Sequence, residues 1–115
     1  MNLPTREEAG VLIVSVSGRI DHIASEEFTS ALTPVLARCR QGDAPVLLDF
    51  SAVDYISSAG LRVLMMASRQ AKAQRGVLAI AALQPLVQEV FAISRFNLIV
   101  PCYASVDSAC QVIAS

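Results

Sequence analysis

Tryptophan is absent from this sequence of 115 residues, and the aromatic content is only 5%. Hydrophobic residues still make up 54% of the chain and charged residues 17%, a composition that excludes an intrinsically disordered protein. The core must therefore be built from aliphatic side chains. The length suits one ordinary domain, and we expect residues 1–115 to form a single domain.

Histidine and cysteine are also scarce. His22 is the only histidine, and the three cysteines, Cys39, Cys102 and Cys110, show no CxxC spacing. These residues provide no set of ligands with the spacing of a metal site. We therefore expect no metal and no cofactor. The odd number of cysteines among apolar neighbours is typical of free, buried thiols in a reducing cytosol.

Sequence signatures of the common enzyme classes are missing as well. The Gly-x-Ser-x-Gly pattern, the P-loop and the dinucleotide-binding glycine pattern do not occur. A hydrolytic triad would have to combine His22 with Ser58 and Asp49 or Asp21, and a lone histidine beside a turn aspartate is usually a surface residue. We expect that the protein is not an enzyme.

Charge and hydropathy narrow the possible partners. The formal net charge of −1 argues against a nucleic-acid-binding protein, which normally carries a basic excess. The spacing of Arg62, Arg69, Lys72 and Arg75 is typical of the solvent-exposed side of a helix. The apolar runs are far shorter than the roughly 20 residues that span a bilayer, and the first eight residues lack the pattern of a signal peptide. We expect a cytoplasmic protein without membrane insertion.

Hydrophobic periodicity predicts an α/β fold. Alternation along 11–17 places Leu12, Val14 and Val16 on one face of a strand and Val11 and Ile13 on the other. We expect a mixed, mostly parallel sheet of four to five strands with about four helices, and the first residues pair with the next strand through a turn at Ala9-Gly10. The expected strands are 11–17, ended by Gly18, then 46–50, 77–82 and 98–100, the last ended by Pro101. The first expected helix has Ser25 as its N-cap and either a kink at Pro34 or an irregular start. The other three start at Ser57 or Ser58, closed by Gly76; at Pro85, with Leu86 facing inward; and after Ser105 as the N-cap.

The segment from Val46 to Arg62 carries the most information about function. An apolar strand ending at Asp49 leads through a loop to a helix that opens with Ser57-Ser58-Ala59-Gly60. Either serine can cap the helix, and the two small residues allow close packing against the sheet. A helix N-terminus at the carboxyl end of a strand also favours anions, because unpaired backbone N–H groups point outward there.

Two motifs resemble those of the STAS family, named for sulphate transporters and anti-sigma factor antagonists. The first runs from Asp49 to Leu61 (DFSAVDYISSAGL), and the second is Gly18-Arg19-Ile20-Asp21-His22. The expected order of elements also matches the STAS domain over essentially the whole chain. The resemblance is closest to the stand-alone bacterial anti-sigma factor antagonists, which regulate transcription indirectly by partner-switching signal transduction.

The resemblance implies the roles of several residues. Ser58 corresponds to the serine that is phosphorylated by a partner serine kinase, which is also the anti-sigma factor; Ser57, where many members have Asp, is the second choice. A serine phosphatase would reverse the modification. The partner-binding residues would be Asp21, Ser57, Ser58, Gly60 and Arg62, with Asp49 as a structural residue near the site.

Simpler roles remain open for three of these residues. Asp21 can be a solvated turn residue, Asp49 can accept backbone N–H groups of the following loop, and Arg62 can be an exposed helix arginine. The function also has an alternative within the family. Some stand-alone members are structural subunits of lipid-transport or stress-signalling complexes without a sigma factor output.

Overall fold

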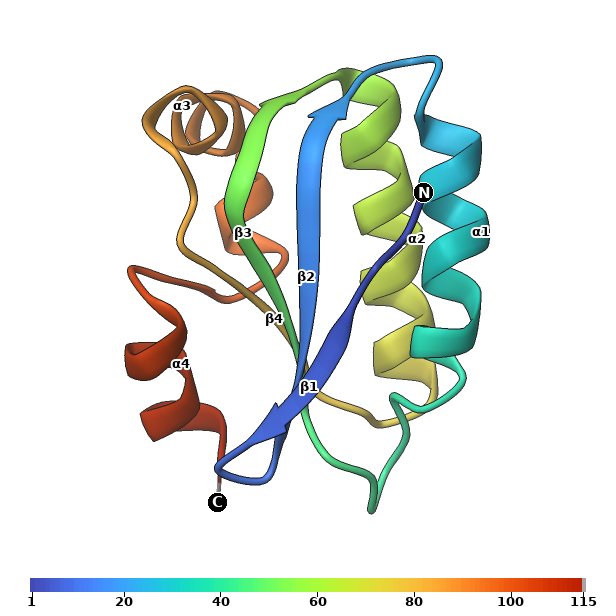
Figure 1. Cartoon of the computed structure of the whole chain (residues 1–115), viewed down its shortest axis with the longest axis vertical. Coiled ribbons are helices and arrows are strands. Elements are labelled where there is room, and N and C mark those ends of the chain that lie inside the picture. The colour runs from blue at the N-terminus through green and yellow to red at the C-terminus, as the bar shows by residue number, and fades with distance from the viewer. Residues whose placement is uncertain (115) are drawn as a thin grey trace.

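The computed structural model describes residues 1–114, which form five strands, four α-helices and one short 3-10 helix (Figure 1). In chain order these are β1 (Thr5–Glu8), β2 (Val11–Ile20), α1 (Ser25–Leu36), β3 (Val46–Ile56), α2 (Ser58–Ala73), β4 (Leu78–Ala81), α3 (Pro85–Ile93), η1 (Phe96–Leu98), β5 (Cys102–Tyr103) and α4 (Val106–Ile113). The predicted α/β class and the order of elements are confirmed.

The strands form one mixed sheet in the order β1-β2-β3-β4-β5. β1 pairs antiparallel with β2, and the other neighbours are parallel. The predicted hairpin is confirmed, because Ala9 and Gly10 both have positive φ (53° and 78°), as a tight turn of this kind requires. In Figure 1, α1 and α2 lie on one side of the sheet, and α3 and α4 lie on the other.

Alternation along β2 divides the core between the two faces of the sheet, as predicted. Leu12 and Val14 belong to a large cluster that includes Phe28 of α1 and Leu64 of α2. Val11 and Ile13 belong to a smaller cluster with Ala109 of α4 and several small residues of the inner strands. Side chains two residues apart share a face of the sheet. Because consecutive residues of β2 are buried on both faces, helices must cover both sides of the sheet.

The two central strands are longer than the sequence predicts. β2 continues through Gly18 to Ile20, and β3 continues past Phe50 to Ile56. Their parallel pairing extends from Leu12–Val46 to Ile20–Ile56, with register shifts between Ser15 and Ser17 and between Gly18 and Arg19. These irregularities interrupt the period-two pattern, which is why the strand ends were placed too early.

The last strand and one helix face also differ from the prediction. Residues 96–98 form η1, with the Phe96 ring buried against Phe91 (centroids 5.1 Å apart), and the final strand is Cys102–Tyr103, after Pro101 rather than before it. An aliphatic run can occur in a buried turn as well as in a strand, so periodicity could not separate the two. Leu86 points outward and is 52% exposed.

Ser25 is the first residue of α1 and not its N-cap, which is Ala24. The Ser25 hydroxyl donates to the His22 carbonyl (2.8 Å), and the Asp21 carboxylate accepts the Ala24 N–H (2.9 Å). The aspartate therefore organises the turn before the helix. Pro34 lies inside the last turn of α1, which ends two residues later.

The exit of α2 depends on a close approach of two backbone segments. The left-handed residue after α2 is Arg75 (φ 59°) and not Gly76, which the sequence predicts to close the helix. Gly76 is needed for a different reason, because a Cβ at this position would lie 2.3 Å from the Cys39 carbonyl oxygen. The contact joins the end of α2 to the segment after α1, and the Gln74 amide strengthens the junction by donating to the carbonyls of Leu36 and Cys39.

We predict that Gly76→Ala lowers the free energy of unfolding by about 2 kcal/mol or more, because the added methyl group meets rigid backbone. Gly42→Ala is the matched control. Gly42 has φ 91° with nothing within 4 Å of a Cβ, so only the backbone penalty of about 1–2 kcal/mol applies. Urea denaturation of both variants measures the difference, and a smaller loss for Gly76→Ala than for Gly42→Ala would contradict the close-approach explanation.

The Cys39 thiol is fully buried and donates to the Val77 carbonyl (3.3 Å). Burial, with a smaller effect of the Asp43 carboxylate, raises its pKa from 9.0 to about 11. The folded chain therefore keeps a proton that the unfolded chain releases as the pH rises above 9.

We predict that Cys39 makes the protein less stable at alkaline pH. Below pH 9 both states hold the thiol proton, and between pH 9 and 11 the free energy of unfolding falls by about 2 kcal/mol on account of this group. Cys39→Ala has no thiol to titrate. The difference in free energy of unfolding between this variant and wild type therefore shifts in favour of the variant as the pH rises from 9 to 11. Denaturation curves of both proteins at pH 8, 9.5 and 11 measure the change, and a constant difference would contradict it.

Candidate functional site

The start of α2 lies directly against the ends of β2 and β3. The Ser57 N–H donates to the carbonyl of Ile20, the last residue of β2 (2.9 Å). The Ser57 side chain then caps the helix, with its Oγ accepting the Gly60 N–H at 3.2 Å. One residue therefore fixes both the position of the helix start and its first turn.

Gly60 makes this junction possible. A Cβ at residue 60 would lie 2.8 Å from side-chain carbons of both Ile20 and Ile56, and 3.1 Å from the Ile20 carbonyl oxygen. The β-branched neighbours are stiff and cannot yield easily. The close packing that the sequence predicts for this small residue is thus present, and it holds the helix start on the sheet.

The two serines have different surroundings. Ser57 is half-buried and its hydroxyl is occupied by the cap. Ser58 is the first residue of the helix, is exposed, and its hydroxyl makes no hydrogen bond to residues 1–114. A bulky enzyme could reach the Ser58 hydroxyl without breaking any interaction of the fold.

Asp21 follows Ile20 directly and therefore lies beside this junction. Its Oδ1 accepts the Ala24 N–H, and its Oδ2 is 3.6 Å from Nε of Arg19. The Arg19 guanidinium in turn lies over the Tyr55 ring, 3.9 Å from the centroid, a typical cation–π arrangement. The turn interpretation of Asp21 is confirmed for its Oδ1 atom, while its other oxygen contacts only the exposed Arg19.

Arg62 lies one turn after Ser58, at the i+4 position, and both residues are exposed. Residues four apart share one face of a helix. Within residues 1–114, no carboxylate oxygen lies within 4 Å of the Arg62 guanidinium. Its charge is therefore available to a phosphate on Ser58 or to a partner.

Asp49 is not part of this site, contrary to the sequence analysis. It lies within β3, paired with Ser15 and Ala81, and seven residues separate it from the end of the strand. At about 3.3 Å per residue, these seven steps place it roughly 23 Å from the end of the strand, which the start of α2 follows. Its carboxylate accepts the Ser51 N–H at 3.0 Å, which is the local role considered as its alternative.

Sequence reasoning missed two features near Ser58. The Arg19–Tyr55 stack depends on the shifted register of β2 and β3, which no local pattern indicates. Ile23, in the loop after Asp21, is 86% exposed. A single exposed apolar side chain is common on protein surfaces, so no sequence signal singles out Ile23. His22, in the same loop, makes no side-chain hydrogen bond with either serine among the described residues.

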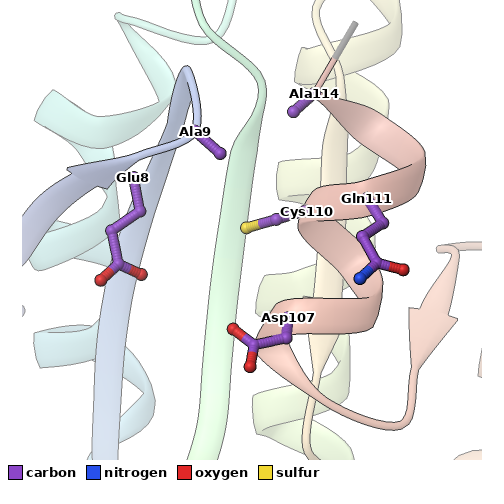
Figure 2. A pocket seen from close by; sticks show the side chains of 6 residues that line it. All are labelled: Glu8, Ala9, Asp107, Cys110, Gln111 and Ala114. Atoms are coloured by element: carbon purple, nitrogen blue, oxygen red, sulfur yellow. The ribbon is translucent and has the colours of Figure 1, made fainter.

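A hollow lies at the opposite end of the strands, between the β1–β2 turn and α4 (Figure 2). It measures about 790 Å³, and the half-buried Cys110 thiol points into it from α4, with the carboxylates of Glu8 and Asp107 also in its lining (Figure 2). Burial and these two carboxylates raise the pKa of Cys110, so its thiolate is disfavoured and the thiol is a poor nucleophile. This hollow therefore does not compete with the Ser58 region as a site of chemistry.

Two negative findings apply to residues 1–114. No group of His, Cys, Asp and Glu side chains is arranged to hold a metal ion. None of the helices has the length and apolar character needed to cross a membrane.

Comparison with known proteins gives a consistent picture. The family model of the STAS domain matches residues 2–109. A protein of Bordetella bronchiseptica named BtrV, provisionally described as an anti-sigma factor antagonist, is 36% identical over 109 residues, which cover 95% of this chain and 91% of BtrV.

Two solved structures share the fold. An anti-sigma factor antagonist from Mycobacterium paratuberculosis superimposes with a TM-score of 0.85 at 23% identity, covering 99% of this chain and 94% of that one. The Bacillus cell fate determinant SpoIIAA in its phosphorylated form gives a TM-score of 0.64 at 17% identity, covering 95% and 96% of the two chains.

The different surroundings of the two serines predict different effects on stability. Ser57→Ala removes the cap and should lower the free energy of unfolding by about 1 kcal/mol. Ser58→Ala, the matched control one residue away, should change it by less than about 0.5 kcal/mol. Thermal and urea denaturation of the two variants provide the comparison. Equal losses would show that the Ser57 hydroxyl does not act as the cap.

Proposed function

Because the chain belongs to the STAS domain family, we propose that it is an anti-sigma factor antagonist whose binding to its anti-sigma factor is switched off by phosphorylation of Ser58. The observation that carries the proposal is the exposed, unbonded Ser58 hydroxyl at the start of α2, beside a Ser57 hydroxyl occupied by the helix cap. The descriptions of BtrV and of the Mycobacterium structure as anti-sigma factor antagonists support the class of partner.

A phosphate on Ser58 is compatible with the fold. The first turn of α2 contains no acidic residue, and the Ser58 and Ala59 N–H groups have no partner in residues 1–114. A phosphate carries a charge of about −1.5 to −2. The positive end of the helix favours that charge by about 0.3–1 kcal/mol. Phosphorylation should therefore leave the domain folded, and the solved structure of SpoIIAA in its phosphorylated form, which has the same fold, supports this expectation.

The same phosphate is unfavourable to a partner that packs on this end of the sheet. Ile23 presents an exposed apolar side chain from the loop after β2, and Ser58 presents only a hydroxyl. A partner that covers these groups would have to desolvate a dianion after phosphorylation, which costs several kcal/mol. Each ~1.4 kcal/mol is a tenfold loss of affinity, so one phosphate is enough to release the partner.

Asp21 and Arg62 provide polar contacts on either side of Ser58. Asp21 is held in place by the Ala24 N–H and keeps its Oδ2 atom toward the exposed Arg19. Arg62 has no intramolecular carboxylate partner in residues 1–114 and can pair with one on the anti-sigma factor. We assign the modification to the anti-sigma factor acting as a serine kinase, and its reversal to a serine phosphatase.

We predict that Ser58→Asp abolishes binding of the anti-sigma factor while Ser58→Ala retains it. Both variants serve as baits in lysate of the native bacterium, bound proteins are identified by mass spectrometry, and the recovered anti-sigma factor is purified for calorimetry. Loss of at least about a hundredfold in affinity is expected for Ser58→Asp, because a carboxylate must be desolvated in the interface. Ser57→Ala is the control, since it removes the neighbouring hydroxyl and leaves Ser58 in place.

Incubation of the purified chain with the recovered protein and ATP tests the modification itself. Phosphate on Ser58, absent from Ser58→Ala and present in Ser57→Ala, is the expected result. Equal binding by the Ala and Asp baits would refute the switch at Ser58. Recovery of lipid-transport or stress-signalling subunits in place of an anti-sigma factor would identify the chain as a structural subunit.

A further inference from the structure

Positive charge is concentrated on one helix of this slightly acidic protein. The segment 55–88 contains no Asp or Glu, and its four cations are Arg62, Arg69, Lys72 and Arg75. All four are exposed, and none has a carboxylate within 4 Å among the described residues. Arg6, Arg19, Arg38 and Arg40 each have one within that distance. The fold thus leaves the charge of α2 uncompensated.

Three of the exposed α2 residues extend in a line from the proposed phosphorylation site. Arg62, Met66 and Arg69 follow Ser58 at spacings of four, four and three residues, so the four side chains share one face of the helix. Met66 is 64% exposed, and it is the only large apolar side chain of α2 that is exposed to this degree. We call these four residues the α2 ridge.

An apolar groove runs beside the α2 ridge, between α1 and α2. Its floor includes Leu32 of α1 and Val63 and Ala67 of α2, and Thr29 and Gln70 are among the polar residues that line it. Its volume of about 270 Å³ is below the roughly 300–1,000 Å³ of pockets that enclose small ligands. The groove is better suited to a few side chains of a docked segment than to a free metabolite.

We propose that the groove and the α2 ridge bind an acidic amphipathic helix of the anti-sigma factor. Apolar side chains of that helix enter the groove beside Met66, and its carboxylates pair with Arg62 and Arg69. A helix that lies in an apolar groove is a common mode of recognition, and α2, at 16 residues, offers roughly 24 Å of length. This inference rests on the proposed function for the identity of the partner.

The geometry favours a protein helix over an anionic membrane. A membrane-binding face needs several large apolar side chains that project outward, whereas α2 offers Met66 alone and the other apolar groups form the floor of a groove. Phosphorylation is coupled to the same surface. A phosphate on Ser58 would lie one turn from Arg62 and would compete for it with the carboxylates of the partner.

The test uses the anti-sigma factor recovered by the Ser58→Ala bait, purified and titrated calorimetrically into the wild-type chain and into each variant of the full chain. Arg69→Glu is three turns from Ser58 and should weaken binding about five- to twentyfold, with a smaller salt dependence than wild type. Met66→Ala should weaken it several-fold. Arg95→Glu is the matched control, because Arg95 is also exposed and has no carboxylate within 4 Å in residues 1–114, but follows α3 on the other side of the sheet. It should change the affinity less than twofold.

The outcomes separate this inference from the proposed function. If Arg69→Glu and Met66→Ala bind with wild-type affinity while Ser58→Asp loses binding, the helix-in-groove proposal is wrong and the switch at Ser58 still holds. Failure of every anti-sigma factor to bind the wild-type chain would overturn both. Two further controls address other occupants. Arg69-dependent binding to vesicles of phosphatidylcholine with 30% phosphatidylserine would assign the ridge to membranes, and Arg69-dependent dimerisation in sedimentation would assign it to a second copy. Either result would overturn the proposal.

Discussion

The contact of the first turn of α2 with the ends of β2 and β3 is the constraint on which the candidate site depends. The Ser57 N–H binds the Ile20 carbonyl, and the missing Cβ of Gly60 lets the helix approach both strand ends. Asp21 follows Ile20 in the chain, so the same contact brings the β2–α1 loop next to Ser58. Without this approach the two motifs found in the sequence would lie on separate elements with no common surface.

Local patterns predicted most of the fold because the central strands alternate regularly or are buried on both faces over the parts that hold the core. Alternation along Val11–Val16 assigned side chains to both faces correctly, and the caps at Ser57 and Ser105 marked the starts of two helices. These features depend on residues within one turn or one strand of each other. Most residues of the candidate site could be predicted for the same reason, since Ser57, Ser58, Gly60 and Arg62 belong to a single helix start.

Several of the errors involve interactions between different segments. The extension of β3 to Ile56 depends on pairing with β2 across two register shifts, and Asp49 was misplaced because its strand was ended too early. The 3-10 turn at Phe96 depends on packing against Phe91, and the need for Gly76 arises from the Cys39 carbonyl of another segment. No periodicity within one segment encodes such contacts, because their partners belong to other elements of the fold.

The structure separates the groups that stabilise the protein from those that would control its partners. The core consists of strand and helix side chains that are almost fully buried, whereas Ser58, Arg62 and Arg69 lie on the outer side of α2. Surface changes of charge alter the stability of a domain little, but they act directly on association with a charged partner. A phosphate on Ser58 can therefore change binding by orders of magnitude while the fold stays the same. The contact of Ser57 and Gly60 with the sheet holds the start of α2 rigidly in place. The partner therefore meets the same preorganised surface whether or not Ser58 is phosphorylated.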